Sequence, residues 1–243
     1  MSLRITAATG ARVLRQLRHD PRTIALILVV PVVLVTLIKY VFAGSAVFDR
    51  IGGPLLGVFP MITMFLVTSV TMLRERTSGT LERLMTMPLA KIDLLGGYGG
   101  AFALLAALQA ALVSAVAFWA LGLHVEGARW GVFLLAISNA ILGTAFGLFF
   151  SAFARTEFQA VQFLPAFLFP QILLCGLLSP RSHMSRPLEL VSWALPLTYA
   201  YDALDRVTRG TYGTWLATDV IVVLALAALA LVGGAATLRR RTP

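Results

Sequence analysis

The sequence predicts an all-α polytopic membrane protein, and its composition and apolar runs carry that prediction. Of 243 residues, 58% are hydrophobic and only 13% are charged, with a mean hydropathy of +0.86. Soluble domains carry about 25% charged residues, and a globular domain of this size could not hide so much apolar surface from water. The apolar residues gather in runs long enough to cross a bilayer, which takes about 20 residues. The same composition excludes disordered, collagenous and coiled-coil classes.

Six apolar runs are predicted to be transmembrane helices, all within a single transmembrane domain that covers residues 1–243. No large soluble domain fits between the runs. The third run is long enough to tilt or to extend beyond the bilayer. Pro165 and Pro170 should kink the fifth run, because proline removes a helical hydrogen bond. The predicted spans are residues 23–42, 54–73, 94–123, 130–154, 158–178 and 215–238.

The N-terminal segment, residues 1–20, is predicted to form an amphipathic helix on the membrane surface rather than a signal peptide. In a helical projection, its apolar and small residues share one side and its arginines take the other. Such a helix lies among the headgroups with its arginines toward anionic lipid. A helix packed on a soluble partner is the alternative. The apolar side holds Leu3, Ala7, Gly10, Val13, Leu14 and Leu17, and the basic side holds Arg4, Arg12, Arg15 and Arg18.

Loop charges predict that both termini are cytoplasmic. In that orientation 13 of the 20 Lys and Arg and 5 of the 11 Asp and Glu face the cytoplasm, so the inner charge is 13 − 5 = +8. The remaining residues give 7 − 6 = +1 outside. Positive charge is enriched in cytoplasmic loops of membrane proteins, so this excess orients the helices rather than binding nucleic acid. We expect a multi-pass protein of the cell membrane, plasma or inner, surrounded by lipids.

The sequence lacks the common catalytic motifs. The glycines at 96–100 are followed by Ala101 and Phe102, not by the Lys and Ser/Thr of a phosphate-binding loop, and they favour close helix packing. No HExxH or GxSxG motif is present, and three histidines far apart in sequence predict no metal site. The spans contain no clear ionisable relay of the kind that proton-coupled carriers use. Energy for uphill transport is therefore expected to come from another chain.

The most informative stretch is the connection at residues 74–91, between the second and third predicted spans. From Arg74 it reads RERTSGTLERLMTMPL. The apolar spacing predicts a short amphipathic helix that ends at Pro88, with a plain interfacial loop as the alternative. The apolar face would hold Leu81, Leu84 and Met85, while Glu82, Arg83 and Thr86 point elsewhere.

This connection resembles the coupling loop of ABC-2 permeases, the membrane subunits of type-2 ABC exporters. The family pattern is approximately R-E-x-x-x-G-T-x-E-x-L-x-x-x-P. A second segment, Leu-Pro-Leu-Thr-Tyr at 195–199, resembles the family's L-P-x-T-Y before the last span. The surface helix and six spans also fit, so the resemblance covers the whole chain. The matching loop residues are Arg74, Glu75, Gly79, Thr80, Glu82, Leu84 and Pro88.

The resemblance implies that this loop docks in a groove of a separate ABC ATPase, a dimer of nucleotide-binding subunits. ATP and Mg would bind to that partner, while this chain would bind no cofactor and catalyse no reaction itself. A second permease chain, identical or a sister, would complete the pathway. The residues implied at the ATPase interface are Glu75, Gly79, Thr80, Glu82, Arg83, Met87 and Pro88.

The outer segment, residues 179–214, mixes apolar residues and prolines with charges. This content favours short helices that re-enter the outer leaflet, as the family has, over an exposed loop. Such helices would restrict the outer exit. The implied outer gate consists of Trp193, Pro196 and Tyr199.

Phenylalanines concentrate in the fourth and fifth predicted spans and could line a route for a hydrophobic substrate. Core packing or lipid contact is the alternative for each one. Gln109, Gln162 and Gln171 are notable polar residues in or near the spans that could bond between helices or contact substrate, and Gly143 and Gly147 suit close helix contact. The candidate pathway residues are Asn139, Phe146, Phe149, Phe150, Phe153, Phe163 and Phe167.

Together these observations predict the permease subunit of an ATP-driven exporter. The expected cargo is an amphipathic small molecule such as a drug or lipid-like metabolite. Lipid, polysaccharide or ion export by a permease of the same family is the nearest alternative. A lipid-modifying membrane enzyme would need clustered catalytic acids or histidines, and a channel or carrier without an ATPase would have no use for the matched loop.

Overall fold

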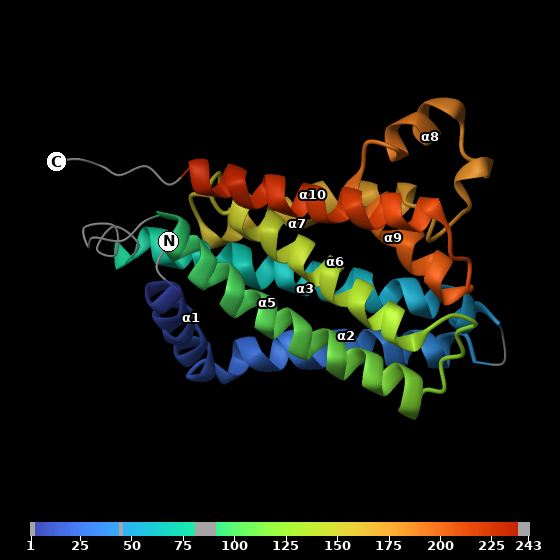
Figure 1. Cartoon of the computed structure of the whole chain (residues 1–243), viewed down its shortest axis with the longest axis horizontal. Helices are drawn as coiled ribbons and strands as arrows, with labels where there is room; N and C mark the ends of the chain where they lie inside the picture. The colour runs from blue at the N-terminus through green and yellow to red at the C-terminus, as the bar shows by residue number, and fades with distance from the viewer. Residues whose placement is uncertain (1–2, 44–45, 81–90, 238–243) are drawn as a thin grey trace.

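The computed structural model describes residues 3–43, 46–80 and 91–237, which form helices joined by short connections (Figure 1). The segment between α7 and α10 contains the 3-10 turn Arg181–His183 and two short helices, α8 Arg186–Ser192 and α9 Pro196–Thr208. A π-helical turn, Val116–Ala120, extends α5. The predicted all-α class is confirmed. The other helices are α1 Leu3–Arg18, α2 Pro21–Val41, α3 Val47–Thr77, α5 Lys91–Ala115, α6 Arg129–Phe150, α7 Glu157–Leu174 and α10 Thr214–Ala236.

Five helices in the described part of the chain are long and apolar enough to cross a membrane. They are α2, α3, the stretch from Gly96 to Ala120, α6 and the stretch from Thr214 to Gly234, and they overlap five of the predicted spans. The helix in the remaining predicted span, α7, has 18 residues, begins at Glu157 and contains Pro165 and Pro170. It does not count among the five, so the sixth span stays a prediction.

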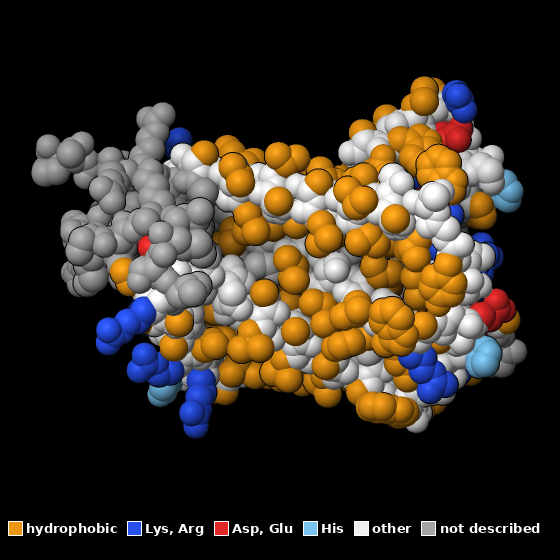
Figure 2. Space-filling model, viewed as in Figure 1, with side chains coloured by type: hydrophobic (Ala, Val, Ile, Leu, Met, Phe, Trp, Pro, Cys, Tyr) orange, Lys and Arg blue, Asp and Glu red, His pale blue; other side chains and the backbone are white. Residues whose placement is uncertain are grey.

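Helix α3 forms the centre of the bundle. Within its most apolar window 72% of residues are buried, against 17% for α2 and 22% for α10. It packs against α2, α5, α6, α7 and α9. The peripheral helices expose apolar side chains instead, and Figure 2 shows hydrophobic side chains spread along the length of the bundle on this face. A surface of this kind suits lipid rather than water.

Small residues allow the closest helix contacts, as the sequence predicted for Gly143 and Gly147. A Cβ added at Gly143 would lie 2.2 Å from the carbonyl oxygen of Met61, and one at Gly147 would lie 2.6 Å from that of Phe65. Helices α3 and α6 therefore meet backbone to backbone. Gly97 lets α5 approach α1 closely, because a Cβ there would lie 2.5 Å from the Cβ of Thr9.

The two ends of the bundle differ in their side chains. One end, here called the α1 end, holds α1 and the last turns of α3 and α10; the opposite end, the α8 end, holds α8 and the start of α10 (Figure 1). At the α8 end Trp119, Trp130 and Trp215 are 65–81% exposed. Exposed tryptophans of this kind form the aromatic belt at a membrane–water interface. At the α1 end Arg4, Arg15 and Arg18 are exposed.

Candidate functional site

The last turn of α3, which leads into the predicted coupling loop, is held by side chains from other helices. Arg74 donates from Nε to Glu157 Oε1 at 2.7 Å and from its terminal nitrogen to Glu157 Oε2 at 2.9 Å. This two-bond contact joins the end of α3 to the first residue of α7. Arg76 donates to Thr237 Oγ1 at 3.3 Å, directly after α10. Three helix ends therefore meet where the loop begins.

Glu75, expected at the ATPase interface, lies inside this chain instead. Its side chain is 3% exposed, and one carboxylate oxygen is 3.6 Å from a guanidinium nitrogen of Arg12 in α1. Arg12 also donates to the hydroxyl of the fully buried Tyr98 in α5 and lies over its ring, 5.6 Å from the centroid. A buried carboxylate needs a nearby cation, and Arg12 supplies it.

The prediction that Arg12 faces lipid headgroups is therefore wrong. In a helical projection Arg12 lies on the basic side, about 100° from Val13, but its long flexible stem lets the charged group reach inward. Arg15 and Arg18 remain exposed, so their expected contact with lipid is not contradicted.

Gly79 supplies the turn that leaves α3. Its φ is +72°, a left-handed conformation that glycine adopts without strain. No atom lies within 4 Å of the position that a Cβ would take, so the requirement is backbone conformation rather than space. Thr80 follows, with its hydroxyl 2.9 Å from that of Ser78. The remaining expected interface residues, Glu82, Arg83, Met87 and Pro88, lie outside the described residues.

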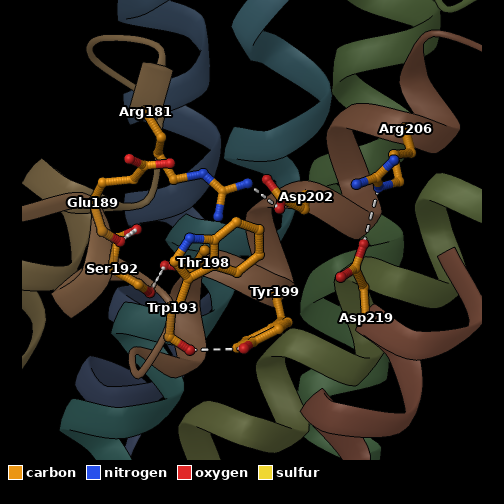
Figure 3. Close-up of polar contacts among 9 residues, drawn as sticks. All are labelled: Arg181, Glu189, Ser192, Trp193, Thr198, Tyr199, Asp202, Arg206 and Asp219. Atoms are coloured by element: carbon orange, nitrogen blue, oxygen red, sulfur yellow. Dashed lines mark hydrogen bonds and ion pairs between the residues drawn. The ribbon is translucent and has the colours of Figure 1, made fainter. Parts of the chain in front are cut away.

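At the α8 end, one ion pair forms within the outer segment and a second joins it to α10 (Figure 3). Arg181 pairs with Asp202 of α9, and its guanidinium lies over the ring of Trp193, 4.5 Å from the centroid. Arg206, one turn further along α9, donates to Asp219 of α10 at 3.0 Å. Helix α9 therefore takes part in both ion pairs, as the acid in one and as the base in the other.

The Asp202 carboxyl titrates closer to neutrality than an ordinary aspartate. Burial raises its pKa to about 6, while the paired Arg181 opposes the rise and the negative charge of Asp219 adds to it. The ion pair with Arg181 is therefore sensitive to modest acidification.

The expected gate residues come together around the start of α9. The Tyr199 hydroxyl donates to the backbone carbonyl of Trp193 at 2.7 Å, and the two rings lie 6.5 Å apart (Figure 3). Pro196 is the first residue of α9, where its missing N–H costs nothing. Trp193 itself is 46% exposed. The three residues therefore form one corner between α8 and α9.

The candidate pathway phenylalanines form a packed layer between α3, α6 and α7. Phe150 contacts Phe65, Phe163 and Phe167, with ring centroids 4.7–5.7 Å apart, and Phe146 contacts Phe167 at 5.0 Å. Phe149 contacts Phe150 and Phe153. Phe153 is 53% exposed. Within one chain most of this set is core packing, and Phe153 has the most open position.

Gln109, Gln162 and Gln171, together with Asn139, are the uncharged polar residues noted in the sequence. All except Gln162 make hydrogen bonds between or within helices. Gln109 donates to the Ile27 carbonyl of α2 at 2.8 Å and to the Thr63 hydroxyl of α3. Asn139, expected in the pathway, is 2% exposed and lies 3.5 Å from the Ala200 carbonyl. Gln171 accepts from the Leu197 N–H, and Gln162 is exposed.

Sequence reasoning missed the long-range pairs of this site. Three ion pairs join residues that no local sequence pattern connects: Arg74 with Glu157, Arg181 with Asp202, and Arg206 with Asp219. One signal was present: each charge lies beside an apolar run, where an unpaired charge is unfavourable.

These features define the class of the protein: an all-helical, multi-pass membrane protein whose inter-helix ion pairs lie at the two ends of the bundle. The chain belongs to the ABC-2 type transporter family, because the model of that family matches residues 5–207. It is a member of a family of transporter permeases, the membrane subunits.

Relatives with known names agree with this assignment. The chain is 28% identical over 153 residues to the probable multidrug ABC transporter permease YbhR of Escherichia coli, covering 63% of this chain and 42% of that protein. It is 26% identical over 171 residues to YbhS, also named a probable multidrug ABC transporter permease, covering 70% and 44%. ABC transporter G family member 20 of Dictyostelium discoideum is 28% identical over 145 residues, covering 59% and 20%. The matched region is less than half of each relative.

Proposed function

We propose that this chain is the membrane-spanning subunit of an ATP-driven exporter, with ATP hydrolysed by a separate nucleotide-binding subunit. The observation that carries the proposal is the end of α3, where a left-handed Gly79 directs the chain into a loop that matches the family's coupling pattern. The contacts of Arg74, Glu75 and Arg76 tie this end to α7, α1 and the end of α10. A force applied to the loop would therefore reach several helices.

The proposed complex contains a dimer of ABC ATPase subunits, which bind ATP and Mg, and a second permease chain. The loop would face the cytoplasm, where the ATPase is found, and both termini would lie on the same side. The proposed cargo is an amphipathic small molecule such as a drug or lipid-like metabolite. The names of the two bacterial relatives and the apolar character of the bundle support this cargo class.

Co-purification tests the proposal most directly. The chain is co-expressed with an ATP-binding cassette protein of the same genome and purified by a tag on the permease. Recovery of the ATPase with the wild-type chain, and ethidium export that requires ATP in reconstituted vesicles, are the expected results. Failure to recover any ATPase overturns the assignment of an ATP-driven subunit, and ATPase recovery without ethidium export overturns the drug-like cargo.

Charge reversal in the loop locates the interface. Glu82→Arg should leave the permease folded and inserted, yet reduce ATPase recovery, because removing one side of a charge pair at a protein contact costs about 2–5 kcal/mol. Glu126→Arg is the matched control, since Glu126 is exposed at the α8 end. Equal recovery with both variants would place the ATPase contact elsewhere.

A further inference from the structure

Helix α7 makes polar contacts at both of its ends, one at the α1 end of the bundle and one at the α8 end. At its start, Glu157 accepts both hydrogen bonds from Arg74 of α3, the first residue of the connection that resembles the coupling loop. Both side chains are about half exposed, at 56% and 51%. Exposed pairs contribute little net free energy, but the two parallel hydrogen bonds fix the geometry between the end of α3 and the start of α7.

At the other end of α7 the contact is buried. Gln171 is 1% exposed; its Nε2 donates to the Phe167 carbonyl at 3.0 Å, and its Oε1 accepts from the Leu197 N–H at 3.1 Å. Leu197 lies in the first turn of α9, whose N–H groups have no partner within the helix. The N-cap of α9, Leu195, makes no side-chain bond. Gln171 therefore caps α9 from another helix.

Between these contacts α7 is held mainly on one side. Phe163 and Phe167 pack against Phe150, while Phe158 and Phe169 on the other side are 72% and 56% exposed. Along its length α7 packs against α3, and at its end against α8 and α9. From residue 157 to residue 171 the helix spans about 21 Å at about 1.5 Å per residue.

We propose that α7 transmits movement of the coupling end of α3 to the outer gate, with Glu157 and Gln171 as its positioning residues. A shift of the α3 end acts on the start of α7 through Arg74. Gln171 passes the shift to the start of α9, which carries Tyr199. The bond from Tyr199 to the Trp193 carbonyl then holds or releases the corner between α8 and α9. This proposal rests on the proposed function, because the ATPase supplies the movement.

The experiment follows the outer segment in the reconstituted complex of permease and ATPase. Ser182, exposed near the gate, is replaced by cysteine in a Cys175→Ala chain, and its labelling by a membrane-impermeant maleimide is timed. Rates are compared without nucleotide and with ATP and vanadate. In the wild-type background the two rates should differ.

Glu157→Arg and Gln171→Leu should each reduce that nucleotide-dependent difference about fivefold or more, while ATPase recovery stays normal. The double variant should lose no more than either single variant, because both act on one helix. The charge swap Arg74→Glu with Glu157→Arg should restore the difference, which a general folding defect would not allow. Gln162→Leu is the matched control, since Gln162 is an exposed glutamine of the same helix.

The outcomes separate this proposal from the proposed function. Normal ATPase recovery with an undiminished labelling difference in Glu157→Arg or Gln171→Leu overturns the role of α7 and leaves the proposed function intact. A wild-type chain that recovers no ATPase overturns both. An equal loss in Gln162→Leu also overturns the proposal, because the effect would then not depend on the two ends.

Discussion

At the scale of single residues, Gln109 supplies a hydrogen bond that Pro31 removes from α2. Pro31 lies inside α2 and has no N–H, so the carbonyl four residues earlier, at Ile27, has no helical partner. Gln109 of α5 supplies that partner from 2.8 Å. An unpaired carbonyl in an apolar environment is costly, so Gln109 offsets the free-energy cost of Pro31.

Replacing Gln109 should therefore cost more when Pro31 is present than when it is absent. Gln109→Leu should lower the free energy of unfolding by about 1–2 kcal/mol. In a Pro31→Ala background the cost should fall by about 1 kcal/mol, because the substituted residue has an N–H that can donate to the Ile27 carbonyl. Unfolding in mixed detergent micelles, followed by circular dichroism, measures both. An equal cost in the two backgrounds would show that Gln109 does not act through Ile27.

Sequence reasoning found these residues but not their pairing. It identified Gln109 and Gln171 as polar residues in apolar surroundings and left open whether they bind substrate or other helices. The choice depends on which helices are neighbours, which a single sequence does not encode locally. The prediction that Arg12 contacts lipid was wrong for another reason. A helical projection gives the direction of a Cβ, whereas the long arginine stem lets the charged group reach Tyr98 and Glu75.

At the scale of helices, the α3–α6 contact depends on the absence of side chains. Gly143→Ala should destabilise the protein by about 1–3 kcal/mol, because the new methyl group meets the Met61 backbone. Gly100→Ala is the matched control: its Cβ would meet no atom within 4 Å, and alanine is the better helix former by about 1 kcal/mol. Thermal unfolding in detergent compares them. If both variants lose equal stability, the close approach does not hold these helices.

The outer segment should respond to acidification through Asp202. Because its pKa is about 6 when folded and near 3.8 when unfolded, the folded state binds the extra proton between these values. Lowering the pH through 6 therefore does not reduce the contribution of Asp202 to the free energy of unfolding; it raises it. The neutral carboxyl nevertheless loses its charge interaction with Arg181, so the outer segment should loosen without unfolding.

Labelling of Ser182→Cys, in Cys175→Ala chains with and without Asp202→Asn, measures this loosening. The ratio of the two rates at each pH cancels the pH dependence of the thiol itself. Above pH 6 the chain with Asp202 should label more slowly than the Asn variant, and below pH 6 the rates should converge. A ratio that stays constant with pH would contradict the role of Asp202.

The helices themselves were predictable to different degrees. The predicted span at 23–42 differs little from α2, because a long apolar run determines such a helix directly, while the span at 130–154 begins with α6 and overran its end by about a turn. The run at 54–73 missed about two turns at the start of α3, which begins at Val47, and about one turn at its end, Thr77. At that end the helix continues through polar residues whose side chains contact α1, α7 and the end of α10. The run at 158–178 overran α7, which ends at Leu174 shortly before Gly176 with its φ of +103°.

At the scale of the whole molecule, the loop charges predict the orientation of the bundle in the membrane. The sequence arithmetic gives +8 on the side of the N-terminus and +1 on the other. The structure places α1 and the end of α3 at one end of the bundle, and α8 and the start of α10 at the opposite end (Figure 1). Lys and Arg on the cytoplasmic side hold a helical membrane protein in one orientation.

The orientation predicts which of two exposed serines an external reagent can reach. Ser78, the C-cap of α3, lies at the α1 end, and Ser182 lies in the outer segment. In Cys175→Ala chains, Ser182→Cys should react with an impermeant maleimide in intact cells, whereas Ser78→Cys should react only after permeabilisation. Cys175 is the single cysteine of the sequence, so replacing it leaves the introduced thiol as the only one. The reverse pattern would put the coupling loop outside the cell, away from any ATP, and would remove the basis for an ATPase partner altogether.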